Sequence, residues 1–147
     1  MGRGLMFVDA SAIVAILGRE PGHREIEKRL AAVDGRIFVS PLVKFEASVA
    51  LARQKAAAKG TNVKPPPELL RRAQRAVDAF VEDLDAEEVA ITPEVGRRAL
   101  DAGATYGKAV GHPADLNFGD CFAYACAKQS GVPLIYKGDD FTHTDLA

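Results

Sequence analysis

The chain has 147 residues, of which 48% are hydrophobic and 27% are charged. These values exclude a disordered chain and a disulfide scaffold, and they predict a single globular domain over residues 1–147. No stretch reaches the roughly 18 to 20 apolar residues that cross a bilayer, so we expect a soluble, cytoplasmic protein without membrane contact. The formal net charge is −1, from 19 basic and 20 acidic residues, and this total disfavours a nucleic-acid partner.

The charges are, however, segregated along the chain. Residues 53–75 contain seven basic residues and one acid, whereas residues 78–88 contain six acids and no base. The total of −1 is therefore a cancellation between two blocks and describes neither of them.

The first 60 residues predict a strand, two helices, a second strand and a third helix, in that order. The apolar runs at 5–8 and 36–39 are typical of short buried strands. Helical spacing of apolar residues covers 12–17, 21–33 and 41–59. Ser40 supplies a cap for the third helix, and the proline at position 41 suits its first turn.

The rest of the chain repeats this alternation after a proline-rich linker at 60–67, where proline ends the third helix. Strands are predicted at 89–91 and 132–136, and helices at 68–84, 93–106 and 118–130, with Thr92 and Asn117 as caps of the last two helices. Apolar strands that alternate with helices indicate a parallel sheet with helices on both faces, which is the α/β class. In such sheets ligands bind beyond the carboxyl ends of the strands.

Acidic residues occur at four of these positions. Asp9 follows the first strand, Glu46 lies in the second turn of the helix after the second strand, Asp120 opens the last helix, and Asp139 and Asp140 follow the fourth strand. Taken singly, Asp9 suits a helix cap, Asp120 suits a helix dipole, and the adjacent pair suits a turn.

Glu46 is harder to explain, because it shares the apolar stripe of its helix and a buried carboxylate needs a partner. An ion pair with Arg53 remains an open alternative. If the acids converge instead, two carboxylates about 4 Å apart repel by about 4 kcal/mol at an effective dielectric near 20. A divalent cation would relieve this repulsion, and a set of oxygen ligands without His or Cys selects Mg²⁺ or Mn²⁺.

Four segments resemble the PIN-domain ribonucleases of the VapC toxin type. They are MFVDASA at 6–12, KFEASVAL at 44–51, HPADLNFGDCFAYACAK at 112–128 and VPLIYKGDDFTHTDL at 132–146. The resemblance spans nearly the whole chain in the expected order. It implies a Rossmann-like three-layer α/β/α sandwich around a central parallel sheet, the PIN fold.

The resemblance also implies the roles of the site residues. Asp9, Glu46, Asp120 and Asp139 would be catalytic, with Asp9 and Asp120 as metal ligands and Asp140 as an alternative to Asp139. Ser11 would orient a carboxylate or a water molecule. Such a site binds Mg²⁺, or Mn²⁺ as a substitute, activates water for attack on phosphorus, and cuts single-stranded RNA into products with a 5′-phosphate and a 3′-hydroxyl.

An acidic site repels RNA, so basic residues must hold the substrate. Arg71, Arg72 and Arg75 share one helix face and are the candidates; the alternative is a solvated face or pairing with the acids of 78–88. The resemblance further implies a homodimer and a cognate VapB antitoxin that inhibits the enzyme, with operator DNA bound only by the antitoxin complex.

Three other functions compete with this hypothesis. A Mg²⁺-binding receiver domain of a signalling protein also carries acids at strand ends, but it needs an aspartate at the end of the third strand, where this chain has none. A phosphatase of the Asp-x-Asp type fails because Ser11 occupies the position of its second aspartate. The other alternative is a catalytically inactive PIN binding module, which the four acid positions disfavour.

Overall fold

The computed structural model describes residues 4–60, 62–139 and 141–146, and it contains the predicted alternation of strands and helices. The first half comprises β1 (Leu5–Val8), α1 (Ala10–Leu17), α2 (His23–Ala31), β2 (Arg36–Val39) and α3 (Pro41–Ala57). The second half comprises α4 (Pro67–Asp83), β3 (Glu87–Glu88), α5 (Pro93–Tyr106), the short 3₁₀ helix η1 (Lys108–Val110), α6 (Phe118–Ser130) and β4 (Leu134–Ile135).

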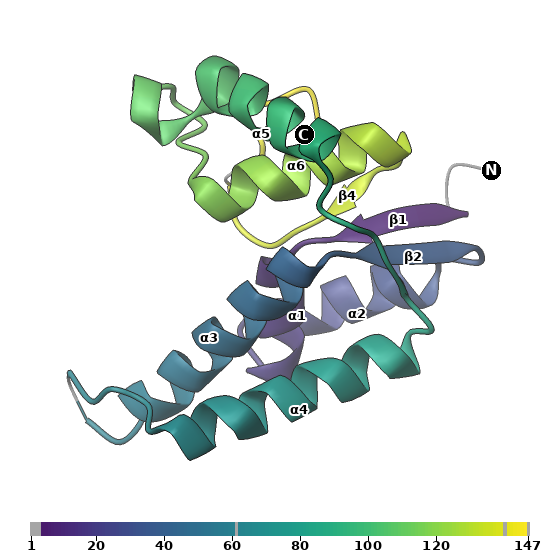
Figure 1. Ribbon diagram of the computed structural model, residues 1–147. Helices are drawn as coiled ribbons and strands as arrows, with labels where there is room; N and C mark the ends of the chain where they lie inside the picture. The colour runs from purple at the N-terminus through teal and green to yellow at the C-terminus, as the bar shows by residue number, and fades with distance from the viewer. Residues whose placement is uncertain (1–3, 61, 140, 147) are drawn as a thin grey trace.

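The four strands form one parallel sheet in the order β3-β2-β1-β4. Phe7 of β1 is paired with Phe38 of β2 on one side and with Leu134 of β4 on the other. Helices α5 and α6 lie on one side of the strands and α1 to α4 lie on the other, as Figure 1 shows. The predicted three-layer α/β/α sandwich with a central parallel sheet is confirmed.

The strand order places a crevice at the carboxyl end of β1. The chain leaves β1 toward β2 on one side, whereas β4 returns on the other side, and ligands bind where the direction of winding reverses. Phe7, Val8 and Ile135 at this point are completely buried, which explains why these strands are continuous apolar runs. The packed core therefore holds the ends of β1 and β4 rigidly beneath the crevice.

Side-chain caps begin four of the helices. Asp9 Oδ2 accepts from the backbone N–H of Ser11 at 3.0 Å at the start of α1, and Ser40 and Thr92 cap α3 and α5 in the same way. At the start of α6, Asn117 and Asp120 each accept from the other's backbone N–H, at 2.9 and 3.1 Å, to form a capping box. The predicted caps at Asp9, Ser40, Thr92 and Asn117 are confirmed.

Several predicted boundaries were wrong. The third strand is Glu87–Glu88 rather than 89–91, because the parallel pairing is with Phe38 and Val39 of β2 and the edge position leaves both glutamates exposed. β4 is limited to two residues, 134–135, by its short pairing with β1. Helix α2 begins at residue 23, because Gly22 before it adopts the left-handed conformation with φ 87°. Within the described ranges, no helix combines the length and apolarity that a membrane crossing requires.

Candidate active site

A cleft of about 430 Å³ lies at the carboxyl ends of β1 and β4. We call it the acidic cleft. Its polar lining residues are Asp9, Ser11, Glu20, Glu46, Asn117, Asp120 and Lys137. The structure therefore brings together three of the four predicted acids and Ser11, from the end of β1, the first turns of α1 and α6, and the second turn of α3.

The caps of α1 and α6 aim Asp9 and Asp120 into this cleft. Both side chains are buried, with exposed fractions of 4% and 7%. One oxygen of each carboxylate accepts a backbone N–H within its own helix turn, which sets the direction of the carboxyl group. Capping and function are therefore not alternatives here, because the cap is what orients each candidate ligand.

Glu46 reaches the same cleft from α3 and lies directly against α6. A Cβ atom at Gly119 would overlap the Glu46 carboxyl group, so the absence of a side chain at Gly119 makes room for it. Burial and, secondarily, the negative charge of Asp9 raise the pKa of Glu46 to about 7. Arg53 is not among the groups that affect this pKa, so the predicted alternative of an ion pair between Glu46 and Arg53 is not supported.

Removing the charge of Glu46 should stabilise the metal-free chain above neutral pH. The pKa of Glu46 rises from its ordinary value of 4.5 to about 7 on folding, so its stabilising contribution is present at low pH and lost as the pH rises through 7. We expect Glu46→Gln to melt at a higher temperature than the wild type at pH 8 in EDTA, and at a similar temperature at pH 5. Circular dichroism melts measure this, and a variant that is less stable at pH 8 would contradict it.

Two residues of the cleft were missed by the sequence analysis, Glu20 and Lys137. Lys137 Nζ donates to Glu20 Oε1 at 2.8 Å, and Gln54 Nε2 donates to Glu20 Oε2 at 2.9 Å. The backbone N–H of Lys137 also donates to Ser11 Oγ at 2.9 Å, so Ser11 ties the end of β4 to α1. Lys137 lies two residues after β4, so a lysine that follows a strand was its signal, but in the sequence this lysine suited only the receiver-domain alternative.

The remaining predicted site residues lie outside the acidic cleft. Asp139 is exposed and does not line it, although its neighbour Gly138 does; Asp140 lies outside the described residues. The role of Asp139, or of Asp140 as its alternative, as the fourth catalytic acid therefore stays a prediction.

The predicted basic face is also separate from the cleft. Arg71, Arg72 and Arg75 are exposed on α4 and do not line the cleft. Arg75 pairs with Glu68 at 3.5 Å, whereas Asp78 and Glu88 pair with Lys44 of α3 at 3.0 and 3.2 Å. Asp78 and Glu88 therefore pair with Lys44, and the predicted alternative that they pair with Arg71, Arg72 or Arg75 is not supported.

The donor chemistry of the cleft fits a hard divalent cation. Its candidate ligands are carboxylate oxygens, and a bound cation would offset the repulsion between Glu46 and Asp9 that, with burial, raises the pKa of Glu46. Among the residues that the structure describes, no group of three or more His, Cys, Asp or Glu side chains is arranged to hold an ion unaided. Mg²⁺ usually binds through one or two carboxylates and keeps several waters, so Asp9 and Asp120 suffice as protein ligands.

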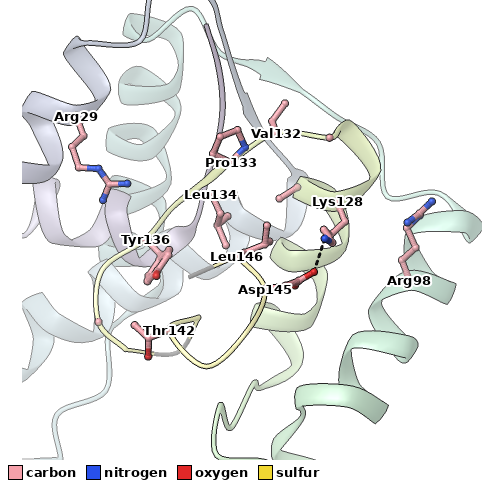
Figure 2. A pocket seen from close by; sticks show the side chains of 13 residues that line it. Arg29, Arg98, Lys128, Val132, Pro133, Leu134, Tyr136, Thr142, Asp145 and Leu146 are labelled. Atoms are coloured by element: carbon pink, nitrogen blue, oxygen red, sulfur yellow. Dashed lines mark hydrogen bonds and ion pairs between the residues drawn. The ribbon is translucent and has the colours of Figure 1, made fainter. Parts of the chain in front are cut away.

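A larger cavity of about 830 Å³ lies beside β4 and the C-terminal segment (Figure 2). It is lined by Arg29, Arg98 and Lys128 among others, and the Lys128 ammonium group pairs with Asp145 at 2.6 Å. None of the predicted acids that the structure describes, which are Asp9, Glu46, Asp120 and Asp139, lines this cavity. This cavity and an apolar groove of about 990 Å³ on α5, η1 and α6 are both larger than the acidic cleft, so size does not identify the cavity that the acids line.

The fold and the cleft define an α/β protein with buried carboxylates at the switch point of its sheet. The family model of the PIN domain matches residues 6–146. A VapC ribonuclease of Rhizobium meliloti (strain 1021) is 56% identical over 143 residues, which cover 97% of this chain and 99% of that protein.

Two solved structures share the fold. The crystal structure of Mycobacterium tuberculosis VapC20, a toxin that cleaves the sarcin-ricin loop, superimposes with a TM-score of 0.70 at 19% identity, covering 97% of this chain and 96% of that one. VapBC2 from Rickettsia felis, bound to a DNA fragment from its promoter, gives a TM-score of 0.60 at 12% identity, covering 97% of this chain and 94% of that one. The chain belongs to the PIN-domain family and, within it, to the VapC ribonucleases.

Proposed function

We propose that this chain is a Mg²⁺-dependent endoribonuclease toxin that cuts single-stranded regions of RNA in the cytoplasm. The observation that carries the proposal is the convergence of Asp9, Glu46 and Asp120 on one cleft at the switch point of the sheet. Membership of the VapC ribonucleases supports the reaction class. It also excludes the receiver-domain alternative, whereas a catalytically inactive PIN module remains for the experiment to test.

In this mechanism the chain itself supplies position and charge. Asp9 and Asp120 would hold the cation, which when bound lowers the pKa of water for attack on phosphorus and offsets the charge of the phosphate. The caps of α1 and α6 keep both carboxylates oriented before substrate arrives. Glu46 contributes a third carboxylate, and we retain Asp139 as the proposed fourth. Ser11 supports the site by fixing the backbone of Lys137.

Metal removal tests this function directly. Purified chain incubated with an unstructured RNA should cleave it in Mg²⁺ or Mn²⁺, and cleavage should stop when EDTA is added, because no water is then activated for attack on phosphorus. Gel electrophoresis of end-labelled RNA measures the products. Cleavage that continues in EDTA contradicts the proposal, and no cleavage with either metal favours the inactive module.

We propose that the exposed arginines of α4 hold RNA at a distance from the reacting group. Each backbone phosphate bound by a basic residue adds about 0.7 to the salt slope of single-strand binding. Replacing Arg71, Arg72 and Arg75 together with alanine should therefore lower that slope by about 2. Fluorescence anisotropy between low and moderate salt measures this slope. An unchanged slope would show that these arginines form a solvated face that does not contact RNA.

We also propose a homodimer and an inhibitory VapB-type antitoxin, with operator DNA bound only by their complex. The structure of Rickettsia felis VapBC2 bound to a DNA fragment from its promoter supports a complex that binds operator DNA. Leu100, Val110 and Phe118 are 77%, 60% and 70% exposed around an apolar groove of about 990 Å³ on α5, η1 and α6. Apolar side chains exposed together mark interaction surfaces, and a two-fold contact would cover both copies of this groove. Light scattering should report a dimer for the purified chain and a monomer for Leu100→Glu.

A further inference from the structure

The acidic cleft contains one basic side chain among its described lining residues, Lys137. The three arginines proposed to hold RNA lie outside the cleft, on α4. A phosphate that approaches Asp9, Glu46 and Asp120 therefore meets three carboxylates before it meets any cation of the basic face. Apart from the metal of the proposed function, Lys137 is therefore the first positive charge that the phosphate would meet, and it lowers the repulsion at the reacting end of the RNA.

Two contacts hold Lys137 in place, and a third holds its partner Glu20. Its backbone N–H donates to Ser11 Oγ in α1 at 2.9 Å, and its ammonium group donates to Glu20 Oε1 at 2.8 Å. The second oxygen of Glu20 accepts from Gln54 Nε2 of α3 at 2.9 Å. The lysine is thereby held at the end of β4 with its charge facing the cleft, although its side chain is long and flexible.

The ion pair that holds Lys137 is open to solvent. The side chains of Lys137 and Glu20 are 35% and 26% exposed. A partly exposed ion pair is weak, so an incoming phosphate can replace the carboxylate of Glu20 at little cost. A buried pair with no access to the cleft would not allow this exchange.

We infer that Lys137 binds a backbone phosphate of the RNA in the acidic cleft, and that Glu20 is a positioning residue that holds the ammonium group until the phosphate arrives. This inference rests on the proposed function, because it names how that site binds its substrate. Glu20 and the phosphate compete for the same ammonium group. The two partners of the ion pair should therefore affect RNA binding in opposite directions.

The test is binding of a fluorescein-labelled single-stranded RNA in EDTA, where the proposed enzyme cannot cleave, over a range of salt concentrations. We expect Lys137→Met to weaken binding about fivefold at low salt and to lower the salt slope by about 0.7, the value of one phosphate contact. Lys137→Arg should preserve the slope. Glu20→Gln should strengthen binding, because it removes a competing negative charge from the cleft.

Lys128 provides a matched control. Its ammonium group also pairs with a carboxylate, that of Asp145 at 2.6 Å (Figure 2). Its side chain is 38% exposed, but it does not line the acidic cleft. Lys128→Met should leave the affinity for RNA and the salt slope unchanged. Thermal melts of every variant establish that it is folded, and Lys137→Gln replaces Lys137→Met if the latter does not fold.

Three outcomes would overturn the inference. They are an unchanged salt slope in Lys137→Met, a loss of affinity in Glu20→Gln that matches the loss in Lys137→Met, and an equal loss in Lys128→Met. The second outcome would identify the ion pair as a purely structural tie. If the wild type cleaves RNA with Mg²⁺ while any of these is found, only the role of Lys137 fails. If the wild type neither binds nor cleaves RNA, the proposed function itself fails.

Discussion

Asp120→Asn should abolish RNA cleavage, with a loss in rate of at least about 100-fold. A metal-bound carboxylate supports several kcal/mol of transition-state charge stabilisation, and each 1.36 kcal/mol corresponds to a factor of ten. The asparagine oxygen can still accept the backbone N–H of Asn117, as Asp120 Oδ2 does at 3.1 Å. The start of α6 should therefore remain capped, and the loss should appear in the rate without a comparable loss of stability.

The measurement is the initial rate of RNA cleavage in Mg²⁺, together with a thermal melt of each variant. Asp101→Asn is the matched control, because Asp101 is exposed on α5 and does not line the acidic cleft. Asp9→Asn should resemble Asp120→Asn, since both carboxylates are buried in the same cleft. An Asp120→Asn protein that is folded and retains the wild-type rate would refute the catalytic role of Asp120.

Gly119→Ala should produce a folded protein with a rate of cleavage about 10-fold to 100-fold lower. The added Cβ would overlap the carboxyl group of Glu46, which is the far end of a flexible side chain. Glu46 can therefore move aside, so the fold survives while a catalytic carboxylate is displaced. Misplacement of a reacting group by about 1 Å costs up to about 100-fold in rate.

A double-mutant cycle shows whether the effect acts through Glu46. In a Glu46→Ala background the obstacle to the Cβ atom is gone, so Gly119→Ala should cause no further loss of activity. Rates of RNA cleavage for the wild type, the two single variants and the double variant complete the cycle. Additive losses would show that Gly119 affects the site by another route, independent of Glu46.

Much of the fold could be predicted from local signals in the sequence. Short apolar runs predicted β1 and β2 with their observed bounds, and the capping residues Ser40 and Asn117 predicted the starts of α3 and α6. These signals work because a strand or a cap depends on residues within a few positions of each other. The predicted position of the third strand was wrong, because two exposed glutamates carry no apolar signal and only their pairing with β2 makes them a strand.

The candidate site, too, could be predicted only in part from the sequence. Asp9, Glu46 and Asp120 could be found because each lies at a recognisable place, just after a strand or on the inner stripe of a helix. The sequence also contained Arg71, Arg72 and Arg75 as one helix face, but spacing within a helix does not reveal which way that helix is turned. The structure places this face on α4, outside the acidic cleft.

By itself, the sequence determined the fold class, the family resemblance and the identity of the candidate acids, because these depend on local pattern and composition. Only the tertiary structure decided what surrounds the acids. The bond from Lys137 to Glu20 joins residues 117 positions apart, and the contact of Glu46 with Gly119 joins α3 to α6. Contacts of this kind arise from the packing of the helices around the sheet, so no local pattern encodes them. The net charge of −1 likewise gives no sign that the acids line a cleft while the basic residues form a separate, exposed face.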